Sequence, residues 1–90
     1  MRITYDEFEK SVEILGLISL TTKSKVKKRY LELSKTYHPD MPQGNLVKFQ
    51  EINKAYELLN FYMDNFRYTF SKEEFEDQFP FGVSQKDWIV

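Results

Sequence analysis

Apolar residues recur at helical spacing in three consecutive stretches of the chain. The spacings of three and four residues place each set on one face of a helix. The three sets are Tyr5, Phe8, Val12 and Leu15, then Val26, Tyr30, Leu33 and Tyr37, then Leu46, Phe49, Ile52, Tyr56 and Leu59. They predict helices over about 5–15, over 23–37, and from about 45. No helix breaker follows the third set at once, so the third helix is expected to extend to about residue 67.

Residues that cap helices stand at the predicted ends. Thr4 and Glu7 have the spacing of a capping box, in which the threonine oxygen accepts a backbone N–H of the first turn. Gly16 is typical of a helix stop. Thr21 or Thr22 is expected to cap the second helix.

The second and third helices are predicted to form an antiparallel hairpin. His38 precedes Pro39, and a residue before proline is disfavoured in the helical region, so the second helix is expected to end at or just before His38. The link over 40–45 is short and rich in turn formers, which favours helices that lie side by side. Their apolar faces should meet across the hairpin, with Ala55 allowing close approach and the first helix covering the seam.

The region after the third helix predicts one more short element. Ser71 and Glu74 repeat the capping-box spacing, which indicates a helix over about 72–79 that Pro80 ends. Residues 81–90 are expected to be extended or loosely ordered. The fold class is therefore all-α, with a helical domain over 1–70 and an aromatic and acidic extension over 71–90.

Aromatic residues are concentrated in the C-terminal third. Nine of the fifteen aromatic residues fall between Phe61 and Val90. The favoured interpretation is that they pack back on the helical core. The alternative is an exposed patch for a client, a partner or a second copy, with Trp88 and the residues after it as the main candidates.

Composition restricts the classes of protein to consider. Ninety residues, 41% of them hydrophobic, suffice for one domain with a single core. The absence of cysteine excludes disulfides and thiolate zinc sites. No stretch approaches the roughly 18 apolar residues of a membrane span, and the first residues lack the apolar core of a signal peptide. A cytoplasmic monomer without a cofactor or metal is expected.

Positive charge is concentrated on the second predicted helix. Between Thr22 and Tyr37 there are six basic residues and one acid, in a chain whose net charge is −1. The basic residues are Lys23, Lys25, Lys27, Lys28, Arg29 and Lys35, and the acid is Glu32. Such a face suits an acidic partner. Binding of nucleic acid is a weaker alternative, because the rest of the chain is acidic and no recognition helix is evident.

The second helix leads into a tripeptide that is a weak signal alone but a strong one in its surroundings. Tyr37 is followed by His38-Pro39-Asp40, and the third helix reads Phe-Gln-Glu-Ile-Asn-Lys-Ala-Tyr-Glu-Leu-Leu over 49–59. This combination resembles a J-domain, with the resemblance running over about 12–59. The J-domain-only or otherwise minimal members are the nearest in organisation.

The resemblance implies a co-chaperone that is not itself an enzyme. J-domains dock on a heat-shock-70 (DnaK-type) chaperone and stimulate its ATP hydrolysis. By the same resemblance, the basic helix meets an acidic surface of the chaperone and the tripeptide loop triggers hydrolysis. The residues implied in partner binding are His38, Pro39, Asp40, Lys23, Lys27, Lys28 and Tyr30. The ring of Tyr30 is expected to pack while its hydroxyl end reaches the docking surface, and Lys25 and Lys35 are expected to be bystanders.

Several residues depart from the family pattern. Leu31 and Glu32 interrupt the basic run, Arg29 replaces a small packing residue and could add charge, and Met41 follows the tripeptide where a basic residue is frequent. The alternative hypothesis is a J-like scaffold that binds a partner through its aromatic C-terminal segment and stimulates ATP hydrolysis little.

Overall fold

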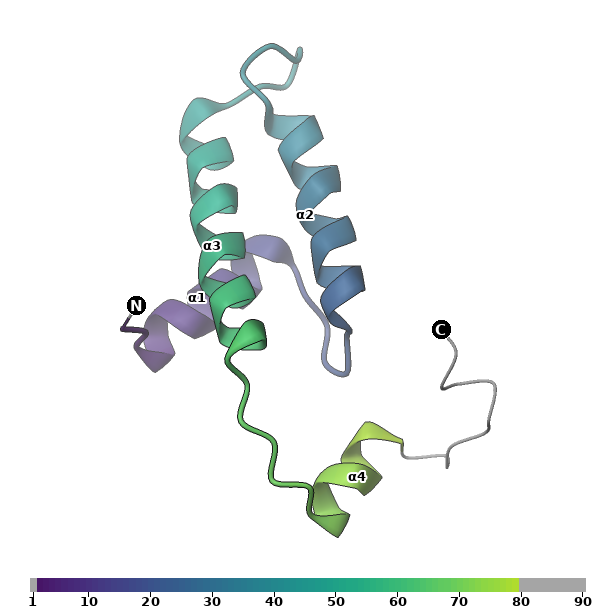
Figure 1. The fold of residues 1–90 in the computed structure, drawn as a ribbon. Coiled ribbons are helices and arrows are strands. Elements are labelled where there is room, and N and C mark those ends of the chain that lie inside the picture. The colour runs from purple at the N-terminus through teal and green to yellow at the C-terminus, as the bar shows by residue number, and fades with distance from the viewer. Residues whose placement is uncertain (1, 80–90) are drawn as a thin grey trace.

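Four α-helices and their connections make up the described part of the chain, residues 2–79 of a computed structural model (Figure 1). The helices are α1 (Tyr5–Leu15), α2 (Lys23–Tyr37), α3 (Leu46–Asp64) and α4 (Lys72–Gln78). No strand occurs over residues 2–79, so the predicted all-α class is confirmed. The expectations for residues 80–90 lie outside the described residues.

Side chains cap the N-terminal ends of all four helices, and the sequence predicted three of these caps. The oxygens of Thr4, Thr22, Asn45 and Ser71 each accept the backbone N–H three residues later. Each cap satisfies one of the N–H groups that the first turn of a helix leaves unpaired. At the other end of α1, Gly16 adopts a left-handed conformation at φ 62°, which glycine reaches without steric cost.

The third helix ends at Asp64, short of the predicted residue 67. The cause is Asn65, whose backbone N–H and side-chain amide both donate to the carbonyl oxygen of Phe61, at 3.1 and 2.9 Å. A short polar side chain that competes for backbone groups in this way favours a helix end over continued helix.

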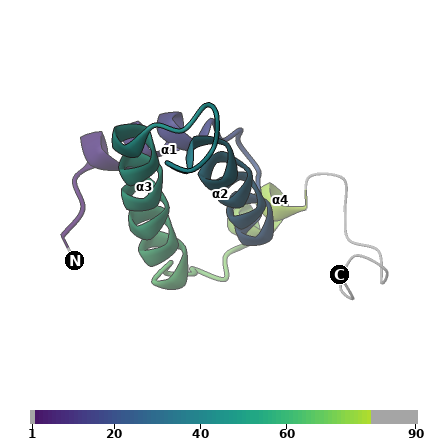
Figure 2. The same ribbon diagram turned by 90° about the horizontal axis from the view of Figure 1, so that it is seen from above.

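A hairpin of α2 and α3, crossed by α1, encloses the core (Figures 1 and 2). The buried apolar residues are Leu15, Val26, Ile52, Ala55, Leu58 and Leu59, with Tyr30, Leu33, Tyr37 and Tyr56 half-buried around them. The predicted seam is therefore confirmed in the main. Phe49 is the exception, because its ring lies against His38 and outside this core cluster.

Over residues 71–79 the extension does not pack on the three-helix core, contrary to expectation, whereas Phe66 of the linker contacts Tyr62 of α3 at 6.1 Å between ring centroids. Helix α4 contacts none of the other three helices (Figure 1), and Phe70 is 90% exposed. The carboxylate of Glu74 accepts the backbone N–H groups of Thr69 and Phe70. These hydrogen bonds hold the end of the linker against α4. These N–H groups hold the pKa of Glu74 below its usual range.

Removing apolar volume at the centre of this core should destabilise the whole domain. Leu15 is fully buried, and its replacement in Leu15→Ala leaves a cavity between the helices. We expect the free energy of unfolding, measured by urea denaturation, to fall by about 2 to 5 kcal/mol. Ile18→Ala, at a position that is 79% exposed, is the control and should change it by less than about 0.5 kcal/mol. Equal effects of the two substitutions would contradict this core.

Candidate functional site

The loop between α2 and α3 is built from two successive tight turns. The N–H of Met41 donates to the carbonyl oxygen of His38 at 2.9 Å, and the N–H of Gly44 donates to that of Met41 at 2.8 Å. The N–H of Asn45 then donates to the carbonyl oxygen of Tyr37 at 3.0 Å, which joins the two helix ends. Pro39 occupies the second position of the first turn, where its fixed φ suits the turn. The backbone of this loop is thus held at both ends and in the middle.

His38 and Asp40 have different surroundings within this loop. The imidazole packs edge-on against Phe49 of α3, with ring centroids 5.3 Å apart, and its Nδ1 accepts the backbone N–H of Asp40 at 3.2 Å. The Asp40 carboxylate lies 3.7 Å from the same nitrogen and its side chain is 89% exposed. His38 therefore anchors the turn on α3, while Asp40 presents a carboxylate to solvent.

Gly44 is a site residue that sequence reasoning missed. A Cβ at this position would clash with the carbonyl oxygen of His38 and lie 2.8 and 2.9 Å from those of Met41 and Pro39. Three carbonyls of the tripeptide loop therefore converge on the space that glycine leaves empty. The only signal in the sequence was the position of Gly44 among turn formers, which did not indicate this close approach.

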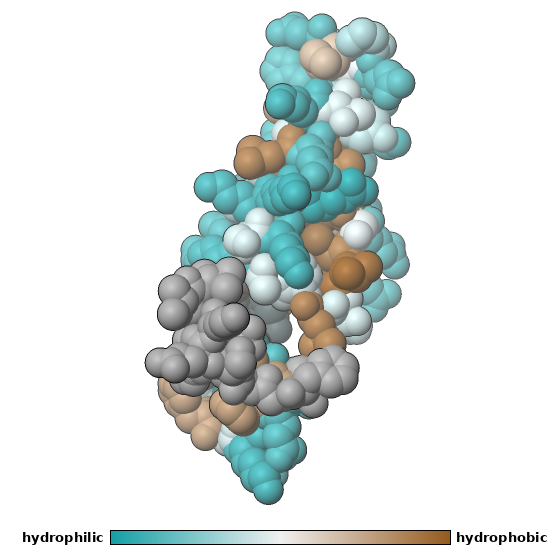
Figure 3. All heavy atoms as spheres, turned by 90° about the vertical axis from the view of Figure 1, so that its right-hand side faces the viewer, coloured by the Kyte–Doolittle hydropathy of each residue, from teal (hydrophilic) through white to brown (hydrophobic). Residues whose placement is uncertain are grey.

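An open groove of about 680 Å³ runs from the loop along α2. Its lining residues include Lys27, Lys28, Lys35, Leu31, His38 and Phe49. Figure 3 views the molecule from the α2 side and shows hydrophilic surface interrupted by hydrophobic patches. We call this feature the lysine groove: three ammonium-bearing side chains border a partly apolar floor.

Residues of α2 outside the predicted docking set also line the lysine groove. Lys35, predicted to be a bystander, lines it, and Leu31, regarded as a gap in the basic run, contributes apolar surface to it. Lys25 is exposed and does not line it. The groove also includes Glu32, which lowers its positive charge.

Lys23 and Tyr30 join α2 to α3. The ammonium of Lys23 donates to the carboxylate of Asp64 at the far end of α3, and this hydrogen bond raises the pKa of Lys23. The Tyr30 ring stacks on Tyr56 at 4.1 Å between centroids and 6° between planes. Its hydroxyl donates to Asn53 Oδ1 at 3.0 Å. The structure therefore directs the Tyr30 hydroxyl at α3, and neither residue lines the lysine groove.

Arg29 lies beside the C-terminal end of α1. Its Nε donates to the carbonyl oxygen of Leu15 at 3.1 Å, and its guanidinium lies 3.6 Å from the carboxylate of Glu32. A cation at a helix C-terminus is favourable because the last carbonyls carry partial negative charge. Arg29 thus connects α1 to α2 and does not extend the lysine groove.

The side chains of this site are suited to contact with another molecule and to ion pairing with it. The site combines an exposed carboxylate, an imidazole edge and lysine ammonium groups. Over residues 2–79, no group of three or more His, Cys, Asp or Glu side chains could hold a metal ion. Within the same residues, no helix has the length and apolar character that crossing a membrane requires.

Comparisons with known proteins agree on one family. The family model described as "DnaJ domain" matches residues 12–64. Proteins named "Chaperone protein DnaJ" from Mycoplasma mobile and Lysinibacillus sphaericus are each 50% identical to the chain over 50 residues, and one from Acetivibrio thermocellus is 47% identical over 51 residues. Each match covers 53% of this chain and 13% of the relative. No solved structure gives a significant match.

A methyl group at Gly44 should disturb the loop without unfolding the helices. In Gly44→Ala the added carbon meets backbone carbonyl oxygens, which cannot move aside as a flexible side chain could. We expect the amide NMR shifts of residues 38–41 to change while the helical circular dichroism is retained. Gln43→Ala, at the exposed neighbouring position, should leave those shifts nearly unchanged. Unchanged shifts in both variants would mean that the loop does not depend on glycine at position 44.

Proposed function

The chain belongs to the DnaJ-domain family, and from this membership we propose that it is a co-chaperone of a heat-shock-70 (DnaK-type) chaperone. In this proposal the chain docks on the chaperone through α2 and stimulates its ATP hydrolysis through the His38–Asp40 loop. The chain spans 13% of the length of the curated relatives it matches, so the partner and the activity are proposals for this chain, and the properties of its own surface support them.

The observation that carries the proposal is the continuity of the loop with the lysine groove. His38 belongs to both, since its ring lines the groove while its Nδ1 fixes the Asp40 backbone. A partner that covers the groove would therefore also contact the Asp40 carboxylate, which lies next to His38 at the loop end of the groove. An arginine of the partner is the natural counterpart of that carboxylate, because the pair can form two parallel hydrogen bonds.

Rigidity of the loop supports a triggering role. The turn hydrogen bonds, Pro39 and the ring contact of His38 with Phe49 hold the tripeptide before any partner arrives. A contact surface that is already ordered loses less conformational entropy on binding. Less of the favourable free energy of the Asp40 contact is then offset by the entropy cost of ordering the loop.

Charge supports docking through Lys27, Lys28 and Lys35. These side chains border the groove in a chain whose net charge is −1, so the positive field is local to this face. Such a face speeds association with an acidic surface and makes it sensitive to salt. In the structure, Lys23 and Tyr30 lie where they would set the geometry of α2 against α3, and we propose a supporting role for both.

Replacing His38 tests the loop. In His38→Gln the imidazole that contacts Phe49 and accepts the Asp40 N–H is lost, while the exposed position should leave the helices folded. We expect stimulation of steady-state ATP hydrolysis by a cognate heat-shock-70 chaperone to fall more than about tenfold, as for a central contact worth at least about 1.4 kcal/mol. Gln43→Ala in the same loop is the control. Full stimulation by a folded His38→Gln chain would rule out the proposed role of the loop.

Reversing charge on the lysine groove tests docking. We expect Lys27→Glu combined with Lys28→Glu to weaken the apparent affinity for the chaperone by about tenfold or more at low salt, and by less at higher salt, because screening reduces the contribution of both charges. Lys25→Glu, a single reversal outside the groove, is the control and should have a small effect. If neither variant changes the concentration dependence of ATPase stimulation, the hypothesis of a J-like scaffold with another binding surface is favoured.

A further inference from the structure

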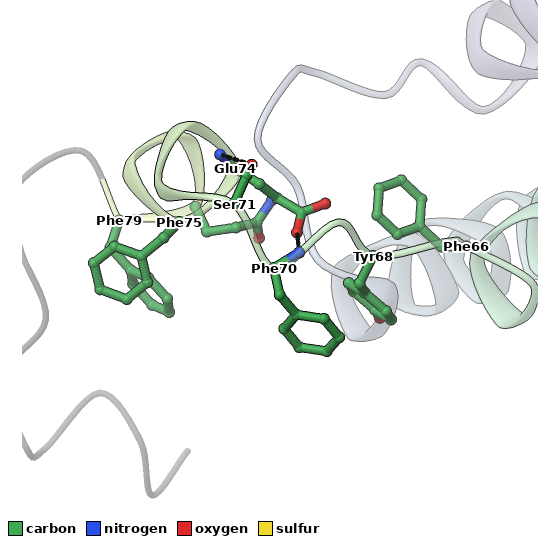
Figure 4. A pocket seen from close by; sticks show the side chains of 8 residues that line it. Phe66, Tyr68, Phe70, Ser71, Glu74, Phe75 and Phe79 are labelled. Carbon is green, nitrogen blue, oxygen red and sulfur yellow. Dashed lines mark hydrogen bonds between the residues drawn. The ribbon is translucent and has the colours of Figure 1, made fainter.

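An aromatic pocket of about 230 Å³ lies in the segment that follows α3 (Figure 4). Five aromatic side chains line it together with Ser71, Glu74 and Gln78, and the aromatic members are Phe66, Tyr68, Phe70, Phe75 and Phe79. None of these residues lines the lysine groove or belongs to the three-helix core cluster. The pocket is therefore a separate feature, and the proposed co-chaperone activity does not use it.

Local hydrogen bonds hold the pocket in shape. The Glu74 carboxylate accepts the N–H groups of Thr69 and Phe70, and Ser71 caps α4. Phe70 has a left-handed backbone at φ 56°, an uncommon conformation for a residue other than glycine, and its side chain is largely exposed.

We propose that the aromatic pocket binds a short apolar segment of another polypeptide that carries lysine or arginine. The aromatic rings supply apolar surface and π faces that attract cations. The acidic residues of α4 are Glu73, Glu74, Glu76 and Asp77, against the single base Lys72. Glu74 lies in the lining itself, so a basic side chain of the ligand would meet opposite charge there.

The exposed area is better suited to a peptide than to a second copy of the chain. The exposed fractions are 41% for Phe66, 65% for Tyr68, 90% for Phe70, 51% for Phe75 and 38% for Phe79. At about 200 Å² per aromatic side chain they offer roughly 570 Å², less than the roughly 800 Å² that each partner of a stable protein interface buries. Two acidic α4 helices brought together would also repel each other, whereas a basic segment is attracted.

Titration with a matched pair of peptides tests this proposal on the full chain. The probes are a fluorescein-labelled leucine-rich peptide that contains arginines, and the same peptide with glutamates in their place. By fluorescence anisotropy we expect the arginine peptide to bind at least about tenfold more tightly, with an affinity that falls as salt increases. Phe75→Ala combined with Phe79→Ala should weaken that binding about tenfold, as expected for loss of buried aromatic contacts. Tyr5→Ala, which removes an exposed ring outside the pocket, should change it less than about twofold.

Other occupants of the pocket give different results. Equal binding of the two peptides, or binding that the double variant does not weaken, would overturn the proposal. So would a dimer of the wild-type chain in sedimentation experiments that the double variant dissociates, because the occupant would then be a second copy. Binding by a full-length Trp88→Ala chain but not by the wild type would assign the pocket to the chain's own C-terminal residues. ATPase stimulation should be unchanged in the double variant, which separates this test from that of the co-chaperone proposal.

Discussion

Burial of Leu15 and Val26 against one face of α3 is the contact on which the other features depend. Each of the three core helices contributes to this cluster, and Ala55 lets the backbones approach closely enough to exclude water from it. A domain of this size buries a limited apolar area, so a few fully buried side chains carry much of its stability. The direction in which α2 leaves the cluster then determines where its lysines and the following loop are presented.

Contacts between α2 and α3 outside the buried core set the geometry of the hairpin. The stacked pair of Tyr30 and Tyr56 lies along it, and Lys23 joins α2 to the C-terminal end of α3 through Asp64. At the opposite end, the Tyr37 carbonyl accepts the N–H of Asn45 and closes the loop. Contacts at both ends and along the length restrict sliding of one helix against the other. A rigid hairpin is what allows a short loop to be presented in one orientation to a partner.

Charge of opposite sign is separated along the chain. The basic side chains of the lysine groove lie on α2, whereas the acids of the extension lie on α4, which does not contact the three-helix core. The two surfaces therefore favour partners of different chemistry, an acidic protein surface at the groove and a basic apolar segment at the aromatic pocket. The net charge of −1 does not reveal this separation, because the excess of acids on α1 and α4 offsets the excess of bases on α2.

Features that depend on neighbouring residues were predictable from the amino-acid sequence. The starts of the helices follow from Thr4, Thr22 and Ser71, and the end of α2 follows from Pro39, because caps and proline act on the backbone within a turn. The tripeptide and the family pattern were likewise visible along the chain. Contacts between residues far apart in the sequence became visible only in the folded arrangement of the helices. The pairing of Lys23 with Asp64, the carbonyls around Gly44, and the inclusion of Lys35 and Leu31 in the groove all depend on the rotation and spacing of packed helices. Helical periodicity predicts which face is buried, but not which atoms of two buried faces meet.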